Sequence, residues 1–315
     1  MGVDVGGTKI LIGMASADGE VLRERRYPTD TSSNEAILRS VYAAVDDFWM
    51  TLTPADPRPA AIGLGLVGGV DHRAGVWKSA VNIPIKNPEP VAHNLQQRYG
   101  VPVALDNDVH CSTLAESRLG AGRGVSDFVL ISIGTGVSVG IVANGSLVHG
   151  AGNYAGEAGH MVVSDDPTVC KCGRIGCVEP LLSGGGIITA TRALLPTHPE
   201  SSLHRWGTGL HAGHVYAAAA EGDPLAVFIA DRAVDCIKKM TVNVVNLLNP
   251  ELVVFSGGAL PLARLTSEVI PHLRTTILPI TSASLRDVVL AAVHPEKAGL
   301  VGACCLAFDL LDQPA

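Results

Sequence analysis

Two glycine turns of the same kind constrain the fold of this chain more than any other feature of its sequence. Gly6-Gly7-Thr8 separates two short apolar stretches near the start of the chain, and Gly134-Thr135-Gly136 separates two more near its middle. Short apolar runs on either side of a glycine turn predict a pair of strands. Segments with apolar residues at helical spacing follow each pair. The sequence therefore predicts one α/β design used twice.

The predicted domains follow from this repeat. With 315 residues, 47% of them apolar, the chain is long enough to bury two cores. We expect a smaller N-terminal α/β domain over residues 1–115, completed by a C-terminal helix over about residues 298–315, and a larger domain over residues 116–297. One clear helix is predicted over residues 32–50, with Ser or Asn as its cap.

Both glycine turns are candidate phosphate-binding sites. Without a Cβ, backbone N–H groups can approach a phosphate closely. Asp4 precedes the first turn and Lys9 follows it. Ordinary β-hairpins are the alternative for either turn alone. Because neither turn matches a P-loop or a strand-to-helix G-x-G-x-x-G, we expect phosphate to be held in a cleft between two domains. Actin-like ATPases and sugar kinases have this arrangement.

A carboxylate suited to proton transfer lies in the segment "ALDNDVH". Asp106, Asn107 and Asp108 follow a predicted strand and open a predicted helix that ends at a glycine. Asp or Asn at such a position can simply cap the helix. A kinase that acts on a hydroxyl group also needs a carboxylate beside that hydroxyl to accept its proton. Both interpretations remain open on the residues alone.

Three of the seven cysteines gather within eight residues and predict a metal site. The pattern is H-x₉-C-x-C-x₄-C, with glycines that allow tight turns. Three thiolates and one imidazole form a closed tetrahedral zinc site of the structural kind. A disulfide is disfavoured because the cluster holds an odd number of cysteines. The predicted zinc ligands are His160, Cys170, Cys172 and Cys177, whereas Cys111, Cys236, Cys304 and Cys305 are expected to be core thiols.

Charge and hydropathy disfavour two classes of partner. A net charge of −7 leaves no basic face for nucleic acid. The long uncharged run over residues 128–148 is broken by turns, so we predict no membrane span. The N-terminus lacks the basic and apolar regions of a secretory signal. We therefore expect a cytoplasmic protein with free thiols.

Six segments in order resemble the ROK family of bacterial sugar kinases and repressors, in particular its zinc-bearing glucokinase-type members. They are "DVGGTK", "LDND", "GEAGHM", "CKCGRIGCVE", "FSGGALP" and "KAGLVGACCLA". The resemblance spans essentially the whole chain, and the cysteine motif with its histidine is its most specific part. It implies an actin-like ATPase (ribonuclease H-like) fold and transfer of phosphate from ATP and Mg²⁺ to the 6-hydroxyl of a hexose.

The resemblance also implies roles for individual residues. Asp108 would be the general base. Sugar would be bound by Asn82, Asn107, Asp108, Glu157, His160 and Glu179. ATP and Mg²⁺ would be bound by Asp4, Gly6, Gly7, Thr8, Lys9, Gly134, Thr135, Gly136, Gly257 and Gly258. Zinc would hold one ring nitrogen of His160 so that the other faces the sugar, and the same loop would carry Glu179 to the pocket.

The sequence departs from the family pattern at several places. Val67 stands where the family often has proline, Val137-Ser138-Val139 replaces a glycine-rich stretch, and "LLSGGG" replaces an alanine-serine-glycine pattern. No tryptophan follows Pro84. Three of these departures lie near the expected sugar pocket, so the sugar could be glucose or an amino or N-acetyl sugar such as glucosamine, kanosamine or N-acetylmannosamine.

Other functions of the family stay as alternatives. A ROK-type repressor would need a helix-turn-helix before Asp4, for which only three residues are present. A non-catalytic sugar-binding or zinc-binding protein would not need Asp4, Asp108 and both glycine turns. Polyphosphate is a less favoured donor than ATP. The resemblance and the apolar composition also predict a homodimer.

Overall fold

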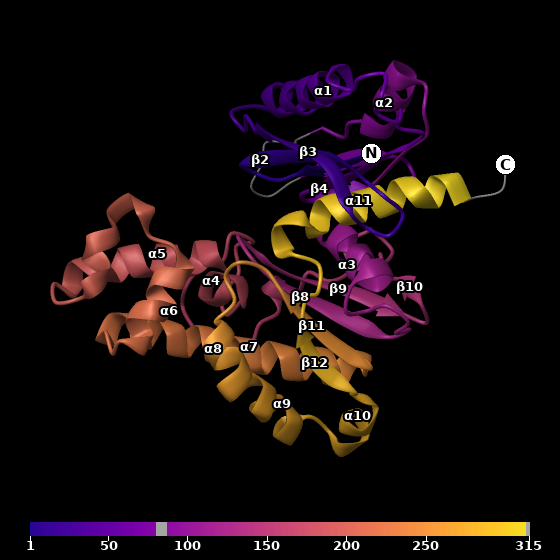
Figure 1. Cartoon of the computed structure of the whole chain (residues 1–315). Coiled ribbons are helices and arrows are strands. Elements are labelled where there is room, and N and C mark those ends of the chain that lie inside the picture. The colour runs from indigo at the N-terminus through magenta and orange to yellow at the C-terminus, as the bar shows by residue number, and fades with distance from the viewer. Residues whose placement is uncertain (80–86, 313–315) are drawn as a thin grey trace. The chain divides into compact units, whose positions relative to one another are not determined.

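The computed structural model describes residues 1–79 and 87–312. Contacts divide the chain into two compact units, each of which is described by itself. Unit 1 comprises Met1–Gly124, Ser146–Ala155 and Ala291–Ala315, and unit 2 comprises Val125–Gly145 and Gly156–Leu290. Each unit is built around a five-stranded sheet (Figure 1). The boundary predicted near residue 115 lies inside helix α3 (Asp108–Leu119).

The sheet of unit 1 has the strand order β3-β2-β1-β4-β7. Strand β1 pairs antiparallel with β2 and parallel with β4, which pairs parallel with β7. Helices α1 and α2 cover one face, and α11 and α3 cover the other (Figure 1). The elements of unit 1 are β1 (Gly2–Val5), β2 (Lys9–Ala15), β3 (Val21–Pro28), α1 (Asn34–Met50), β4 (Ile62–Leu66), β5 (Gly69–Asp71), β6 (Val76–Ser79), α2 (Val91–Tyr99), β7 (Val103–Asn107), α3 (Asp108–Leu119) and α11 (Pro295–Asp312).

Glycines bring helix α11 close to the sheet and to helix α3. A Cβ on Gly63 of β4 would lie 1.8 Å from the carbonyl oxygen of Ala303, and a Cβ on Gly302 would lie 1.8 Å from that of Cys111. Any larger residue at either position would push the helix away. The C-terminal helix therefore belongs to unit 1 through close backbone packing.

The sheet of unit 2 has the order β10-β9-β8-β11-β12. The long helix α7 packs on it, because its buried residues share one apolar cluster with the inner residues of β8 and β11. The strands from unit 2 are β8 (Phe128–Ile133), β9 (Val137–Ala143), β11 (Leu252–Ser256) and β12 (Asp287–Leu290). The two-residue edge strand β10 (Ser146–Leu147) belongs to a segment that is grouped with unit 1. The helices are α4 (Glu179–Leu182), α5 (Gly184–Leu194), α6 (Ala212–Ala220), α7 (Pro224–Leu248), α8 (Leu262–Arg264), α9 (Ile270–Thr276) and α10 (Pro279–Ser284), with shorter helical turns at Ala158–His160, Leu195–Thr197, Ser202–Gly209 and Leu265–Val269.

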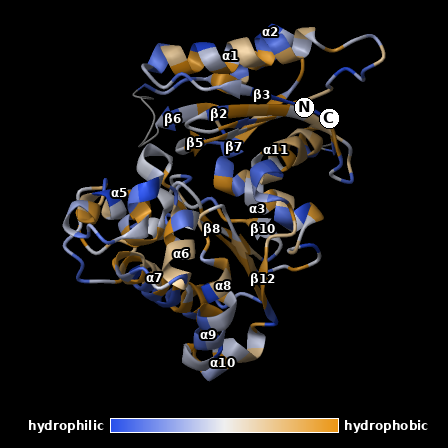
Figure 2. Ribbon diagram, turned by 60° about the vertical axis from the view of Figure 1, so that its left-hand side comes forward, coloured by the Kyte–Doolittle hydropathy of each residue, from blue (hydrophilic) through white to orange (hydrophobic). Residues whose placement is uncertain are grey.

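The predicted fold class is confirmed. Both glycine turns join antiparallel strands that lie side by side in mixed sheets, β1 with β2 and β8 with β9. The helix predicted over residues 32–50 is α1, where the Ser33 side chain accepts a hydrogen bond from the N–H of Ala36 at 3.1 Å. Hydrophobic residues concentrate on the inner strands of each sheet, whereas helices such as α1 carry both hydrophobic and hydrophilic residues (Figure 2).

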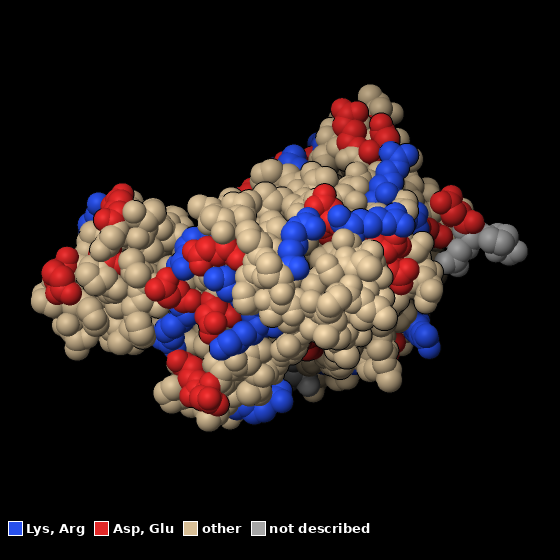
Figure 3. Space-filling model, turned by 90° about the horizontal axis from the view of Figure 1, so that it is seen from below, with Lys and Arg blue, Asp and Glu red and all other residues tan. Residues whose placement is uncertain are grey.

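Two surface features bear on partners. On the face shown in Figure 3, Lys and Arg are interspersed with Asp and Glu. Unit 2 contains ion pairs of Arg264 with Asp231 and of Lys238 with Glu268. In the described part of the chain, no helix combines the length and apolarity needed to cross a bilayer.

Candidate active site and metal centre

Asp4 is a half-buried carboxylic acid near the end of the first strand of unit 1. Burial raises its pKa to about 7, and the negative charge of Asp108 acts in the same direction, while Lys9 acts against both. Helix α11 supports the carboxyl group closely, since a Cβ on Gly299 would lie 2.6 Å from it. The two acids that the sequence placed near phosphate and sugar therefore influence each other within one unit.

The first glycine turn follows Asp4 directly. The N–H of Gly6 donates to the carbonyl oxygen of Lys9 at 2.9 Å, and the carbonyl oxygen of Gly6 accepts from the Thr29 hydroxyl at 3.0 Å. These bonds fix the shape of the turn. A Cβ on Gly7 would meet no atom within 4 Å, so its surroundings are open.

Asn107 caps helix α3 and thereby holds Asp108 at the first helical position. Its side-chain oxygen accepts from the N–H of Val109 at 2.8 Å and of His110 at 3.4 Å. Its amide nitrogen donates to the carbonyl oxygen of Gly68 at 2.9 Å. The capping alternative is thus correct for Asn107. Among residues 1–79 and 87–312 the Asn107 amide donates only the bond to Gly68, and an Asn side chain carries two amide hydrogens.

Three glycine segments meet at one end of the sheet of unit 2. The N–H of Gly184 donates to the carbonyl oxygen of Gly134 at 2.8 Å, which places the start of helix α5 on the second glycine turn. Gly257 follows β11 with a φ of +106°, and a Cβ there would lie 2.2 Å from the carbonyl oxygen of Ile133. The sequence analysis did not include Gly184–Gly186 among the site residues. Three consecutive glycines after Ser183, which caps α5, were the available signal.

Glu179 links the second glycine turn to the cysteine loop, residues 170–177. It is the first residue of α4, two positions after Cys177. Its carboxylate accepts from the N–H of Val137 at 3.2 Å, and a Cβ on Gly136 would lie 2.8 Å from the same oxygen. The segment that follows the cysteines therefore contacts the second glycine turn through Glu179.

His160 and the three cysteines form a group that could hold a metal ion. Their ligand atoms all lie within 4.8 Å of one another. The Sγ atoms of Cys172 and Cys177 are 3.7 Å apart, and Cys170 Sγ lies 3.5 Å from Nδ1 of His160. The predicted glycine turns are present, because Gly173 and Gly176 have φ angles of +85° and +78°.

The two ring nitrogens of His160 face different partners. Nδ1 faces Cys170, whereas Nε2 lies 3.8 Å from a carboxylate oxygen of Glu157. A metal held by Nδ1 would leave Nε2 beside Glu157.

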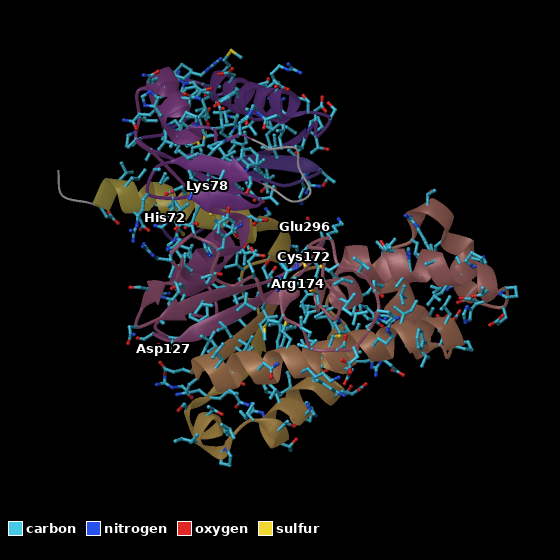
Figure 4. The ribbon with its side chains drawn as sticks, turned by 180° about the vertical axis from the view of Figure 1, so that it is seen from behind. His72, Lys78, Asp127, Cys172, Arg174 and Glu296 are labelled. Carbon is cyan, nitrogen blue, oxygen red and sulfur yellow. The ribbon has the colours of Figure 1, made fainter. Side chains whose placement is uncertain are left out.

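The cysteine loop favours thiolate at Cys172. The pKa of this exposed thiol is lowered to about 6, chiefly because the backbone N–H of Arg174 donates to it. The Arg174 side chain acts in the same direction, and Figure 4 shows the two residues close together. Thiolates are the form of cysteine that binds zinc. Cys111, Cys236, Cys304 and Cys305 are buried, as predicted.

The remaining site predictions divide between the units. Asn82 lies outside the described residues. Asp4, the first glycine turn with Thr8 and Lys9, Asn107 and Asp108 belong to unit 1, and Glu157, His160, Glu179, the second glycine turn and Gly257-Gly258 belong to unit 2.

The sequence model of the ROK family matches residues 1–309. The chain belongs to the ROK family. Among its relatives, this ROK protein is 34% identical over 264 residues to the glucokinase of Halalkalibacterium halodurans, covering 82% of this chain and 79% of the relative. It is 29% identical to the glucokinase of Thermotoga maritima, covering 97% and 96% of the two chains.

A solved structure shares the fold over the whole length. It is a ROK family glucokinase from Streptomyces griseus in complex with glucose and AMPPNP, with a TM-score of 0.81, 29% identity and 98% coverage of both chains. N-acetyl-D-glucosamine kinases and a ROK transcriptional regulator match this ROK protein at similar identity. The predicted family is confirmed, and the protein is glucokinase-like.

Proposed function

We propose that this ROK protein transfers the γ-phosphoryl group of ATP to the 6-hydroxyl of a hexose. The observation that carries the proposal is the placement of Asp108. The Asn107 cap holds it at the start of α3, close enough to Asp4 for its charge to raise the pKa of Asp4. A proton acceptor and a candidate cation-binding acid thus lie near each other in unit 1.

The chemistry assigned to Asp108 is proton transfer. It would accept the proton of the sugar hydroxyl while that oxygen attacks the γ-phosphorus and the bond to the departing ADP breaks. Mg²⁺ would neutralise charge on the phosphates, and Asp4 would hold it through carboxylate oxygen and water. Lys9 adds positive charge beside the first turn.

The open glycine turns support phosphate binding. A Cβ on Gly7 or on Gly134 would meet no atom within 4 Å, and neither residue has a positive φ. Packing and backbone conformation therefore do not demand glycine at either position. Close approach of a phosphate to the two turns would account for glycine at both positions.

The proposed sugar ligands are Asn107 of unit 1 and Glu157, His160 and Glu179 of unit 2, with Asn82. His160 lies beside the cysteines of the cysteine loop, and Glu179 follows the loop. We propose that zinc binds His160 and the three cysteines, since this donor set suits a closed tetrahedral site. Its role would be to orient Nε2 of His160 and the start of α4, without taking part in the transfer.

The experiment that tests this function measures ADP release with a panel of hexoses and amino sugars. Glucose, glucosamine, N-acetylglucosamine and N-acetylmannosamine are the informative members, because kinases for glucose and for N-acetylglucosamine both match the chain. Release with at least one sugar, abolished in Asp108→Asn, supports the proposal. Sugar binding without any sugar-dependent ADP release would instead support a regulator or sugar-binding protein. We propose cytoplasm as the location, where ATP is abundant and thiols stay reduced.

A further inference from the structure

The carboxylate of Asp106, two residues before the proposed base, bridges two histidines. Oδ1 of Asp106 is 2.8 Å from Nδ1 of His110, and Oδ2 is 2.6 Å from Nε2 of His149. We call these three residues the Asp106 bridge. The side chains of Asp106 and His110 are only 5% and 4% exposed. Two of the three side chains are thus buried, His149 is 21% exposed, and the chemistry proposed above does not use the bridge.

The hydrogen bonds of the bridge fix its protonation. Burial would raise the pKa of Asp106, but the bonds from His110 and His149 outweigh burial and hold this pKa well below its ordinary value. Asp106 is therefore a carboxylate that only accepts. Each histidine must then present an N–H to it, which assigns the proton to Nδ1 of His110 and to Nε2 of His149.

The bridge joins segments that are far apart in sequence but lie within unit 1. Asp106 is the penultimate residue of β7, His110 lies in the first turn of α3, and His149 comes from the segment Ser146–Ala155. The ring of His72 stacks on that of His149 with centroids 3.8 Å apart. Figure 4 shows where His72 lies. Burial and the neighbouring His149 lower the pKa of His72, which favours a neutral His72 ring stacked on His149.

The Asp106 carboxylate also forms a hydrogen bond with the backbone next to Asp108, the proposed base. Oδ1 of Asp106 also accepts from the N–H of Asn107 at 2.7 Å. The N–H of His110 in turn lies 3.4 Å from the capping oxygen of Asn107. Asp106 therefore ties both ends of the turn from Asn107 to His110, and Asp108 lies inside that turn.

We infer that Asp106, His110 and His149 are positioning residues that set the orientation of Asn107 and Asp108 toward the sugar hydroxyl. This inference rests on the proposed function. A buried carboxylate is costly to keep, and apolar residues of similar size often replace buried charges without loss of stability. Groups that orient a reacting side chain need such fixed hydrogen bonds, because small displacements at the site reduce the rate strongly.

The test exchanges each histidine for the two amides. The nitrogen of an Asn side chain is as many bonds from Cα as Nδ1 of histidine, and that of Gln is as many as Nε2. His110→Asn and His149→Gln should therefore keep a donor for Asp106, whereas His110→Gln and His149→Asn should lose it. We expect the first pair to retain most of the sugar kcat/KM and the second pair to lose roughly 10- to 100-fold, as for a hydrogen bond to a charged group. The KM for ATP should change less than about threefold.

Position 110 should tolerate Asn but not Gln, and position 149 should tolerate Gln but not Asn. This opposite preference distinguishes a positioning role from a general effect on stability. Equal effects of Asn and Gln at either position, or equal losses in the KM values of sugar and ATP, would overturn the inference. Thermal melts identify variants that fail to fold. His110→Leu and His149→Leu, which keep bulk without a donor, then take the place of the variants that are meant to lose the bond.

A second readout does not depend on activity. Histidine-selective ¹⁵N NMR of the wild-type protein should show two protected imidazole N–H protons, one of which is lost in each Leu variant. Their absence would overturn the bridge. A metal titration could also overturn the bridge. If the wild type binds one more equivalent of zinc or nickel than His149→Leu does, the three groups form a metal site instead.

If no sugar is phosphorylated but both protons are present, the proposed function fails. Sugar calorimetry on the four amide variants then decides whether the bridge orients Asn107: the predicted Asn and Gln pattern in affinity supports it, and equal affinities overturn it.

Discussion

At the scale of single residues, Asp108 and Asp4 have different environments and so different expected roles. Asp108 begins a helix whose cap is provided by its neighbour Asn107. Asp4 lies in the sheet, is half-buried and packs against α11. A base has to meet the sugar, whereas a cation-binding acid can be buried as long as the cation and its waters reach one oxygen. Variants at the two positions should therefore differ in what they lose.

Asp108→Asn should lower kcat by roughly 10²- to 10⁴-fold, the usual contribution of general acid–base catalysis. Sugar affinity should change little, because the substituted amide has almost the same shape and Asn107 still caps the helix. Steady-state kinetics and sugar calorimetry measure the two effects. A variant that keeps more than about half of the wild-type rate, with chemistry limiting, would show that Asp108 is not the base.

Asp4 should make the metal-free protein less stable as the pH rises. Its pKa is raised from 3.8 to about 7 in the folded protein. Between these values the folded state holds a proton that the unfolded chain has lost, so stability falls as the pH rises through this window and the loss is complete above about 7. Asp4→Asn removes the charge. It should therefore raise the melting temperature at about pH 8 and change it little near pH 4.

The same variant should lose activity. An ionised Asp4 is needed to hold Mg²⁺, so the wild-type KM for Mg²⁺-ATP should fall as the pH rises from about 6 to 8, and Asp4→Asn should not show this dependence. Melting curves and ATP titrations at several pH values check both statements. Equal melting temperatures of the two proteins at pH 8 would contradict the assigned ionisation.

At the scale of elements, local pattern predicted some parts of the molecule and missed others. The sequences of helix α1 and strands β1 and β2 have clear apolar periodicity, and a capping serine or a glycine turn marks where they begin or end. Strand β3 was not predicted, because its sequence VLRERRYP is highly charged and forms a strand only by pairing with β2 at the sheet edge. The spacing of the cysteines and glycines predicted the turns of the cysteine loop. The Asp106 bridge could not be predicted, since Asp106 and His149 are 43 positions apart.

The cysteine loop should act on sugar binding through zinc. Cys172→Ser should lower bound zinc from about one per chain towards zero, because a hydroxyl is a poor replacement for thiolate. His160 and the start of α4 at Glu179 would then lose their support. We expect the KM for sugar to rise much more than the KM for ATP. Metal analysis and calorimetry without nucleotide measure these changes.

Two controls make this result specific. Cys236→Ser replaces a buried cysteine of α7 in the same unit and should keep its zinc. Circular dichroism must show that the Cys172 variant is folded. A variant that keeps full zinc, or that loses zinc yet binds sugar with wild-type affinity, would contradict an orienting role. Loss of turnover at saturating sugar with unchanged affinity would indicate a catalytic metal instead.

At the scale of the whole molecule, the sequence was sufficient for the fold class because both sheets begin with the same strand-turn-strand unit. Grouping the segments into units needed long-range contacts. Residues 146–155 belong to unit 1, although residues of unit 2 flank them on both sides. Nothing in the local pattern of "SLVHGAGNYA" indicates this return. The assembly state is also a property of the surface, which local sequence patterns describe poorly.

We predict a homodimer, and unit 2 offers a surface on which to test it. Leu247, Leu278 and Ile280 are 78%, 54% and 78% exposed. The segments that carry them lie near one another, because the Asn246 side chain accepts hydrogen bonds from the N–H of Leu278 and the hydroxyl of Thr281. A group of exposed apolar side chains loses less in water when a second copy covers it. Light scattering should return twice the chain mass of 32.6 kDa.

Charge substitutions then show whether this surface forms the contact. Ile280→Lys should shift the protein to the single-chain mass, since an unpaired ammonium group in an apolar interface is costly. Met50→Lys is the matched control, because Met50 is 76% exposed but belongs to unit 1. It should leave the mass unchanged. A wild-type mass of one chain would refute the dimer, whereas a dimer that persists in Ile280→Lys would place its interface elsewhere.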